Sequence, residues 1–318
     1  MAVTLYTVIP CYNEQEVLPE TSRRMKEKYQ ALMASGAITS ASRIVFVDDG
    51  SRDRTWEMIA QLHEADNIYS GIKLTRNRGH QNALLCGLMT VYPLADAVVS
   101  MDADLQDDIG VIDGFLEQFA QGCDVVYGVR SDRESDTFFK RFTAEAFYKM
   151  MRAMGADVVF NHADCRLMSR RALEGLSQFE EVNLFLRGLV PMVGYRSGVV
   201  TYARHERFAG ESKYPLRKML ALAFEGITSL STRPVKLISL LGAAIFGVSL
   251  LMLLYFFVQY FLGNTVQGWA SLAVSVWALG GLQLLAIGVI GEYVGKVYLE
   301  TKARPRYLVE CFLNDDKK

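Results

Sequence analysis

Two long segments without ionised side chains, near the C-terminus, restrict what this chain can fold into more than any other feature. Residues 235–262 contain one charge, Lys236, close to their start, and residues 269–290 contain none. Each segment has at least the ~20 residues that an α-helix needs to cross the ~30 Å apolar core of a bilayer. A buried helical hairpin of a water-soluble protein is the alternative, and the two lengths argue against it. We therefore predict two membrane-spanning helices joined by the short loop 263–268.

The basic residues that flank these segments predict their orientation. Arg233 and Lys236 lie at the start of the first segment, and the loop 263–268 contains no basic residue. Basic residues also follow the second segment: Lys296, Lys302, Arg304 and Arg306. Because the cytoplasmic flanks of membrane helices are enriched in lysine and arginine, both chain termini are expected in the cytoplasm. The prediction is a two-pass integral protein of the cytoplasmic (plasma) membrane.

Length, charge and cysteine content narrow the class of protein further. At 318 residues the chain is long enough for one large α/β domain plus the helical appendage. The formal net charge of −1 argues against a nucleic-acid-binding protein. The five cysteines show no CxxC or zinc-type spacing, which is typical of reduced thiols in a cytosol. The N-terminal residues lack the basic segment and apolar core of a signal peptide, so we expect the first domain to stay in the cytoplasm.

The first half of the chain alternates between strand-like and helix-like patterns. Short β-prone runs predict strands at residues 5–9, 43–47, 70–74, 97–101 and 124–127. Helical patterns lie between them, at residues 14–35, 55–65, 80–91 and 109–121. This alternation predicts a mainly parallel sheet with helices on both faces, in which ligands bind beyond the carboxyl ends of the strands. The chain has no GxGxxG or GxxxxGK[ST] motif, which removes the main support for dinucleotide-binding and P-loop functions.

Polar residues follow the predicted strands, and the acidic group after the fourth strand is the most informative. Residues 102–108 contain several aspartates together with Gln106, directly after the apolar run 97–101. Carboxylate and amide oxygens suit hard cations such as Mg²⁺ or Mn²⁺. A solvated acidic turn that caps the next helix is the alternative. Similar polar clusters follow the other strands, at residues 10–14, 48–51 and 76–80. Because the carboxyl ends of parallel strands lie at the same edge of a sheet, we expect these polar clusters to form one composite site there.

These motifs occur in a specific order along nearly the whole chain. They lie at residues 9–14, 47–55, 102–106, 166–170, 207–214, 291–293 and 304–305. The ordered set resembles the family-2 glycosyltransferases with the GT-A fold. More narrowly, it is similar to the polyprenyl-phosphate glycosyltransferases, which include dolichol-phosphate mannose synthases and bactoprenol glucosyltransferases. No Gln-x-x-Arg-Trp motif follows the acidic motif, which argues against the processive polymer synthases.

The resemblance and the apolar segments together divide the chain into four parts. We expect a cytoplasmic, Rossmann-like GT-A domain at residues 1–212, a juxtamembrane region at 213–234, two transmembrane helices within 235–290 and a cytoplasmic tail at 291–318. The juxtamembrane region has a basic entry followed by apolar residues, which is typical of a helix lying at a membrane surface. Packing of this helix on the GT-A domain is an equally supported alternative.

For the donor, the resemblance implies a nucleotide-sugar site. Its residues would be Pro10, Tyr12, Glu14, Val47, Asp49, Asp102 and Ala103. The ring of Tyr12 offers a stacking face for a base, and a carboxylate can accept from an imide N–H or a ribose hydroxyl. Asp48 and Asp49 have an alternative role in the turn before Gly50, and one of them could do only that.

For catalysis, the resemblance implies roles for Asp104, Asp164, Arg130 and Arg166, with Mg²⁺ or Mn²⁺ held by Asp104 and Gln106. The candidate phosphate ligands are Arg130, Arg141, Arg207 and Lys213. An arginine fork can bind two phosphate oxygens at once, and a surface salt bridge is the alternative for each of these residues. Asp164 would either act as a base or orient the acceptor. His80 departs from the family pattern, because many bactoprenol enzymes have lysine at this position.

The resemblance therefore predicts an inverting, metal-dependent transfer of one hexose from a nucleotide sugar to undecaprenyl or another polyprenyl phosphate. Glucose from UDP-glucose is the first choice, and membrane lipids are further partners. Small residues in the apolar segments, such as Gly242, Ala243, Gly280 and Gly281, favour a homo-oligomer. Two alternatives stay open: glycosyl transfer to a lipid hydroxyl such as that of diacylglycerol, and a non-catalytic lipid-binding or flippase-partner protein.

Overall fold

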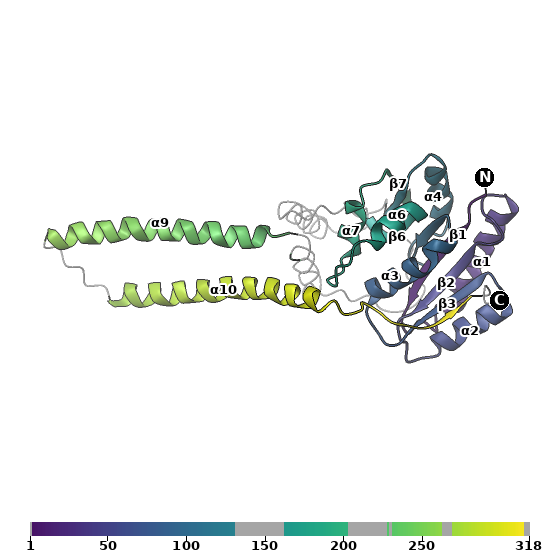
Figure 1. Ribbon diagram of the computed structural model, residues 1–318, viewed down its shortest axis with the longest axis horizontal. Coiled ribbons are helices and arrows are strands. Elements are labelled where there is room, and N and C mark those ends of the chain that lie inside the picture. The colour runs from purple at the N-terminus through teal and green to yellow at the C-terminus, as the bar shows by residue number, and fades with distance from the viewer. Residues whose placement is uncertain (1, 131–161, 203–227, 229–230, 263–268, 315–318) are drawn as a thin grey trace.

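The computed structural model describes residues 2–130, 162–202, 228, 231–262 and 269–314. Its strands are β1 (Leu5–Cys11), β2 (Arg43–Asp48), β3 (Tyr69–Leu74), β4 (Ala97–Ser100), β5 (Val125–Arg130), β6 (His162–Ser169), β7 (Ser197–Tyr202) and β8 (Val309–Leu313). Its helices are α1 (Leu18–Ala34), α2 (Thr55–Ala65), α3 (His80–Val91), the 3-10 turn η1 (Tyr92–Leu94), α4 (Val111–Ala120), α6 (Arg170–Ser177), α7 (Leu186–Met192), α9 (Arg233–Phe261) and α10 (Trp269–Lys302). Figure 1 shows α9 and α10 as two long helices that project from the sheet domain.

The eight strands form one mixed sheet in the order β7-β5-β6-β4-β1-β2-β3-β8. Strands β4, β1, β2 and β3 are parallel neighbours, whereas β6 runs antiparallel between β4 and β5, and β8 runs antiparallel along β3. The α/β domain with a mainly parallel sheet, expected from the sequence, is confirmed. The order of the parallel strands reverses between β1 and β4, and such a switch point opens a ligand crevice at the carboxyl ends of the strands.

Helices cover both faces of the sheet, which explains why its central strands are continuous apolar runs. On one face, Tyr29 of α1 and Phe115 of α4 pack with Phe46 of β2. On the other face, α3, α6 and α7 pack against side chains such as Val8 of β1. A Cβ atom at Gly87 of α3 would lie 2.3 Å from Cγ1 of Val8. Glycine at this position therefore lets α3 lie directly on the strand that leads to the switch point.

The first helix begins later than expected. The sequence predicted a helix from residue 14, but α1 begins at Leu18, because residues 13–17 form a turn. Asn13 has a left-handed φ of 55°, and its Oδ1 accepts a hydrogen bond of 2.9 Å from the Arg52 N–H. The Asn13 N–H in turn donates to Ser51 Oγ at 3.0 Å. The turn therefore joins the loops that follow β1 and β2 instead of continuing α1.

The C-terminal region differs from the expected tail. Helix α10 continues to Lys302, beyond the predicted end at residue 290, and strand β8 then joins the sheet beside β3. The Ser70 hydroxyl donates to the Leu313 carbonyl at 2.5 Å, and Lys73 pairs with Glu310 at 2.9 Å. The chain that leaves the long helices therefore returns to the sheet domain. This anchors the base of α10 to the domain.

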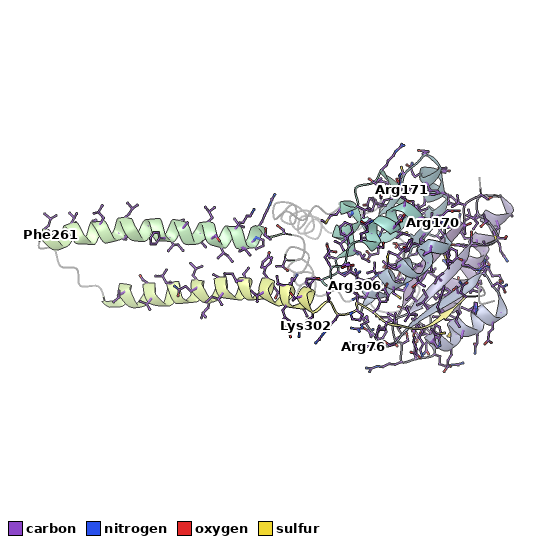
Figure 2. The ribbon with its side chains drawn as sticks, viewed as in Figure 1. Arg76, Arg170, Arg171, Phe261, Lys302 and Arg306 are labelled. Atoms are coloured by element: carbon purple, nitrogen blue, oxygen red, sulfur yellow. The ribbon has the colours of Figure 1, made fainter. Side chains whose placement is uncertain are left out.

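The long helices expose apolar side chains along their length. Leu251 of α9 is 69% exposed and Leu284 of α10 is 71% exposed. Judged by length and composition, one helix among the described residues, over Ala278–Lys302, is long and apolar enough to cross a membrane. Figure 2 shows Phe261 at the far tip of α9, whereas Lys302 and Arg306 lie at the domain end. The loop 263–268 and most of the juxtamembrane region 213–234 lie outside the described residues.

Candidate active site

The candidate site begins at the switch point between β1 and β4. Pro10 and Val47, both predicted to bind the donor, are buried and face each other in the β1–β2 ladder. Tyr12 directly follows β1 and is 42% exposed, so its ring can receive a base. Glu14 lies in the same turn, where its N–H donates to Thr55 Oγ1 at 2.9 Å. The donor contacts of these four residues stay predictions, and their location at a strand-end crevice fits them.

Asp49 connects the loop after β2 to the loop after β3. Its two carboxylate oxygens accept from the N–H groups of Arg78 and Gly79, at 2.7 and 2.9 Å. Gly50 allows this approach, because it has a φ of 67° and a Cβ there would lie 2.6 Å from the Asn77 nitrogen. Burial raises the pKa of Asp49, although the two backbone donors oppose that shift. Asp49 therefore ties the loop after β2 to the residues that precede His80 and α3, and its contact with the donor stays a prediction. The turn before Gly50 uses Asp48, whose Oδ1 accepts a hydrogen bond from the Ser51 N–H at 3.2 Å.

Residues 102–108, which we call the acidic loop, follow β4 in a strained conformation. Leu105 has a left-handed φ of 56°, which is uncommon for a residue with a branched side chain. Asp104 Oδ1 accepts from the Gln106 N–H at 3.2 Å, which closes a local turn around that leucine. This turn brings the two predicted metal ligands onto one short stretch of backbone.

The donor set of the acidic loop suits a shared cation. Among the described residues, no group of three or more His, Cys, Asp or Glu side chains could hold a metal ion alone. Mg²⁺ and ions like it commonly bind one or two protein carboxylates and take their other ligands from substrate phosphates and water. One carboxylate from Asp104 and one amide oxygen from Gln106 match that chemistry. The residues fit an ion shared with a diphosphate.

Two side chains from elsewhere fix the position of the acidic loop. The Thr21 hydroxyl of α1 donates to the Ala103 carbonyl at 2.8 Å, and the Tyr202 hydroxyl of β7 donates to Asp107 Oδ1 at 2.6 Å. Asp107 is 4% exposed, so this hydrogen bond offsets part of the cost of its burial. The acidic loop is therefore attached both to α1 and to the far strand of the sheet.

Asp102 and Asp164 approach each other around His80. The His80 Nε2 atom lies 3.5 Å from Asp102 Oδ1 and 3.9 Å from Asp164 Oδ2. Burial raises the pKa of Asp102 to about 6, with His80 opposing the shift and Asp164, Asp107 and Asp104 adding to it. His80 therefore lies between the two carboxylates and is more than a solvated residue at a helix start.

Asp164 lies between two guanidinium groups, Arg166 of β6 and Arg187 of α7, which we call the arginine pair. Arg166 Nη2 donates to Asp164 Oδ1 at 3.1 Å. Arg187 binds both carboxylate oxygens, with Nε to Oδ1 at 3.1 Å and Nη2 to Oδ2 at 2.9 Å. Burial raises the pKa of Asp164, but the charges of Arg187 and Arg166 lower it further, to well below its usual range. Asp164 is therefore a firmly ionised carboxylate.

The two members of the arginine pair differ in exposure. Arg166 is 1% exposed, and its Nε and Nη1 atoms have no hydrogen-bond partner among the residues that the structure describes. The Arg187 side chain is 35% exposed. Sequence reasoning predicted Arg166 but missed Arg187, which stands alone as a charge within the apolar run 184–190. A single charge in a buried run was the available signal.

The predicted phosphate ligands lie mostly outside the described residues. Arg130 ends β5, where its backbone pairs with Tyr202 of β7, but its side chain is not among those described. Arg141, Arg207 and Lys213 lie outside the described residues altogether. Their contacts with phosphate stay predictions. The described part of the site consists of the β1 and β2 ends, the acidic loop, His80 and Asp164 with the arginine pair.

Comparison with known proteins identifies the class to which this fold and site belong. The model of the family described as Glycosyl transferase family 2 matches residues 6–177. The chain belongs to glycosyltransferase family 2 and is an enzyme, which confirms the prediction from the ordered motifs. Its relatives include the uncharacterized glycosyltransferase YkoT of Bacillus subtilis, 50% identical over 313 residues that cover 98% of this chain and 93% of YkoT. The bactoprenol glucosyl transferase of Shigella phage SfX is 40% identical over 305 residues, covering 95% of this chain and 97% of the phage protein.

Solved structures resemble the chain at low sequence identity. The glucosyl-3-phosphoglycerate synthase of Mycobacterium tuberculosis, in complex with Mn²⁺, UDP-glucose and phosphoglyceric acid, has a TM-score of 0.44 at 18% identity, over 73% of this chain and 79% of its own. The mannosyltransferase PcManGT of Pyrobaculum calidifontis, in complex with GDP-Man and Mn²⁺, has a TM-score of 0.45 at 16% identity, over 94% and 85% of the two chains. The sheet domain of this chain has a mixed and mainly parallel sheet.

Proposed function

We propose that this enzyme transfers one hexose from a nucleotide sugar to a polyprenyl phosphate, with inversion at the anomeric carbon. Glucose from UDP-glucose and undecaprenyl phosphate are the preferred donor and acceptor, in line with the relatives named bactoprenol glucosyl transferases. The observation that carries the choice of acceptor is the pairing of Asp164 with Arg166 and Arg187.

A carboxylate held by two guanidinium groups is a poor proton acceptor. Because the charges of the arginine pair overcome the effect of burial, the pKa of Asp164 lies well below its usual range. An efficient general base has a pKa near the working pH, which Asp164 does not approach. A lipid hydroxyl needs such a base before it can attack a sugar. A phosphate monoester, with a second pKa of about 6, is already largely a dianion and needs none. The pairing of Asp164 therefore favours a phosphate acceptor.

The described side chains have distinct tasks in this reaction. The exposed ring of Tyr12 would stack on the donor base, while Asp104 and Gln106 would hold Mg²⁺ or Mn²⁺ at the diphosphate. A divalent cation bound there supplies positive charge that stabilises the departing nucleoside diphosphate. An oxygen of the acceptor phosphate forms the new bond to the anomeric carbon as the bond to the diphosphate breaks on the opposite face. Asp164 would orient Arg187, whose fork matches the geometry of a phosphate.

The long helices support a membrane-bound acceptor. We propose that α9 and α10 both span the membrane, with the sheet domain and both termini in the cytoplasm and with homo-oligomers formed through the hairpins. Lys302 and Arg306 at the domain end support this orientation (Figure 2). The Arg306 Nη1 atom donates to the Phe179 carbonyl at 3.1 Å, a few residues before α7. This contact brings the segment that precedes Arg187 to the base of the hairpin, where a polyprenyl phosphate headgroup would arrive.

The deciding experiment is an acceptor and donor screen with the purified full-length protein. UDP-glucose, UDP-galactose, UDP-N-acetylglucosamine and GDP-mannose are each offered with undecaprenyl phosphate and Mg²⁺ or Mn²⁺, and diacylglycerol is offered in parallel. We expect transfer to undecaprenyl phosphate, giving a product that mild acid cleaves, because a glycosyl phosphate is acid-labile. Transfer only to diacylglycerol, or an acid-stable product, would overturn the acceptor assignment. Absence of both transfer and metal-dependent donor hydrolysis would overturn the proposed donors and acceptor together.

A further inference from the structure

The last turn of α10 is hydrogen-bonded to the segment that leads into α7. Glu300 Oε2 accepts from the Val182 N–H at 2.8 Å. Glu300 Oε1 accepts from the backbone N–H of Asn183 at 2.8 Å and from its side-chain Nδ2 at 2.7 Å. The Asn183 side chain also donates to the Lys296 carbonyl, one turn earlier in α10, at 3.5 Å. One carboxylate on the long helix thus accepts three hydrogen bonds from a segment more than one hundred residues earlier in the chain.

The same segment is held on its other side by α3. The Leu186 N–H, at the start of α7, donates to the Gln81 side-chain oxygen at 2.9 Å. Gln81 directly follows His80, which faces Asp102 and Asp164. Residues 182–186 therefore form a bridge between the base of α10 and the helix that carries His80. Arg187 is the next residue along the chain, and it binds Asp164 through both oxygens.

We propose that Glu300 is a positioning residue, which holds residues 182–183 and so places Arg187 against Asp164. Segments without regular secondary structure have backbone donors that need an acceptor, and Glu300 supplies acceptors for two consecutive ones. Without this carboxylate, the N–H groups of Val182 and Asn183 would donate to water instead of Glu300. The start of α7 would then keep its hydrogen bond to Gln81 but lose the attachment to α10. Because the two-point contact needs the guanidinium of Arg187 aligned with the Asp164 carboxylate, a displacement of α7 would weaken it.

The consequence is a coupling between the membrane-directed helix and the site. Docking of the base of α10 on the sheet domain and pairing of Asp164 with Arg187 would then be parts of one arrangement. This inference rests on the proposed function only in assigning the arginine pair to the acceptor side of the reaction. The placement of Arg187 by Glu300 is a statement about the folded chain, and it can be tested separately from any acceptor.

The first test measures that placement by hydrogen–deuterium exchange of the full-length protein. In Glu300→Ala we expect exchange of the amides in residues 182–192 to rise about tenfold, because their local opening becomes easier. Asn183→Ala removes only the side-chain donor and should give a smaller rise in the same peptides. Glu310→Ala is the matched control, because Glu310 pairs with Lys73 at the sheet edge. Unchanged exchange in Glu300→Ala would overturn the proposal.

The second test asks whether a displacement of α7 in Glu300→Ala changes the rate of hexose transfer. We expect Glu300→Ala to lower kcat for hexose transfer about tenfold, because a slightly misplaced site group can cost that much. Arg187→Gln should lower it at least as far, and the double variant should be no slower than Arg187→Gln alone, because both changes remove the same contact. Multiplying losses in the double variant would contradict the proposal and would leave Glu300 with a structural role only.

The two proposals fail in different ways. If the wild-type protein glycosylates only another acceptor, the assignment to polyprenyl phosphate is wrong, and the double-variant comparison is made with that acceptor. If the wild-type protein transfers no sugar at all, the exchange experiment still decides whether Glu300 places Arg187. Raised exchange at residues 182–192 in Glu300→Ala, with unchanged exchange in Glu310→Ala, would support the placement in either case.

Discussion

The two carboxylates that face His80 have opposite electrostatic surroundings. Asp102 belongs to the acidic loop, where burial raises its pKa to about 6 and neighbouring aspartates add to the shift. Asp164 lies between Arg166 and Arg187, whose charges lower its pKa well below the usual range in spite of burial. Both lie within 4 Å of the same imidazole nitrogen. The neighbours of each carboxylate, more than its depth in the protein, decide which charge state it prefers.

This difference divides the site into two functional halves. The acidic loop gathers several aspartates beside the half-exposed His80, so a bound cation or proton would stabilise it. The arginine pair already neutralises Asp164 from within. Pairs of carboxylates whose pKa values are pushed apart are typical of sites in which each has a different task. The acidic loop is thus suited to the metal and the donor, and the arginine pair to the acceptor.

The largest effect is expected from removing the charge of Asp104 in the acidic loop. Asp104→Asn should lower the rate of hexose transfer by about 10²–10³-fold, as losing electrostatic stabilisation of a leaving group typically does. Chelation of divalent ions should have the same effect in the wild-type protein. The measurement is the initial rate with UDP-glucose over a range of Mn²⁺ concentrations. Asp113→Asn, on the exposed side of α4, is the matched control. A normal transfer rate in Asp104→Asn would refute the assignment of Asp104 as a metal ligand.

The next largest effect is expected from removing the charge of Asp164, in the half of the site that contains the arginine pair. Asp164→Asn keeps the shape of the side chain but leaves the buried Arg166 without its counter-charge, which should cost about 3 kcal/mol of stability. Transfer should slow about ten- to a hundredfold, because Arg187 loses its two-point partner. Thermal unfolding and kcat of the purified variant measure the two effects. Full activity in Asp164→Asn would refute the role given to this carboxylate.

The pH dependence of stability sharpens this prediction. Because the folded-state pKa of Asp164 is lowered, its contribution to stability is present above its unfolded pKa of about 3.9 and is lost as the pH falls toward the folded value. The difference in unfolding temperature between wild type and Asp164→Asn should therefore be constant near neutral pH and shrink below about pH 4. A difference that grew on acidification would contradict the pairing of Asp164 with the arginines.

Sequence patterns predicted the first five strands and the helices between them well. The bounds of α2 and α3 agree with the expected ranges, because clear turn residues precede both helices and their apolar residues follow a helical period. Strands β6, β7 and β8 were not anticipated. Strand β6 carries Asp164 and Arg166, whose charges interrupt the apolar pattern and neutralise each other only in the folded sheet. Strand β8 pairs with a strand more than two hundred residues away, which local patterns do not reveal.

The candidate site was predictable to the extent that its residues follow strands in family motifs. Asp102 and Asp104 belong to such a motif, whereas Asp164 lies within β6 and was implied by the family resemblance; the structure places Asp102 and Asp164 around His80. Arg187 and Glu300 belong to none of the recognised motifs, and their partners are set by the packing of α7 and α10. Contacts of this kind depend on how elements that are distant in the sequence pack together. A short pattern in a single sequence does not reveal such packing.

A smaller effect, of opposite sign, is expected at Asp102. Because burial raises its folded-state pKa, the charged form is disfavoured in the folded protein, and stability falls as the pH rises from the unfolded pKa toward 6. Asp102→Asn should therefore stabilise the metal-free protein at pH 7.5. The Asp102 side chain is 31% exposed, so solvent screening reduces the expected gain in stability to about 1 kcal/mol. Thermal unfolding with a chelator measures this gain, which should vanish near pH 4. Destabilisation at pH 7.5 would contradict the view that burial disfavours the charged form of Asp102.

The smallest effect is expected at His80, which joins the two halves. Its side chain is 44% exposed, so His80→Gln should change stability by less than about 0.5 kcal/mol. Repeating the substitution in the Asp102→Asn and Asp164→Asn backgrounds shows which carboxylate the imidazole serves. His80 lies nearer to Asp102 and opposes the rise in its pKa, so the small effect should disappear in Asp102→Asn and persist in Asp164→Asn. The reverse pattern would assign His80 to the acceptor side, together with the arginine pair.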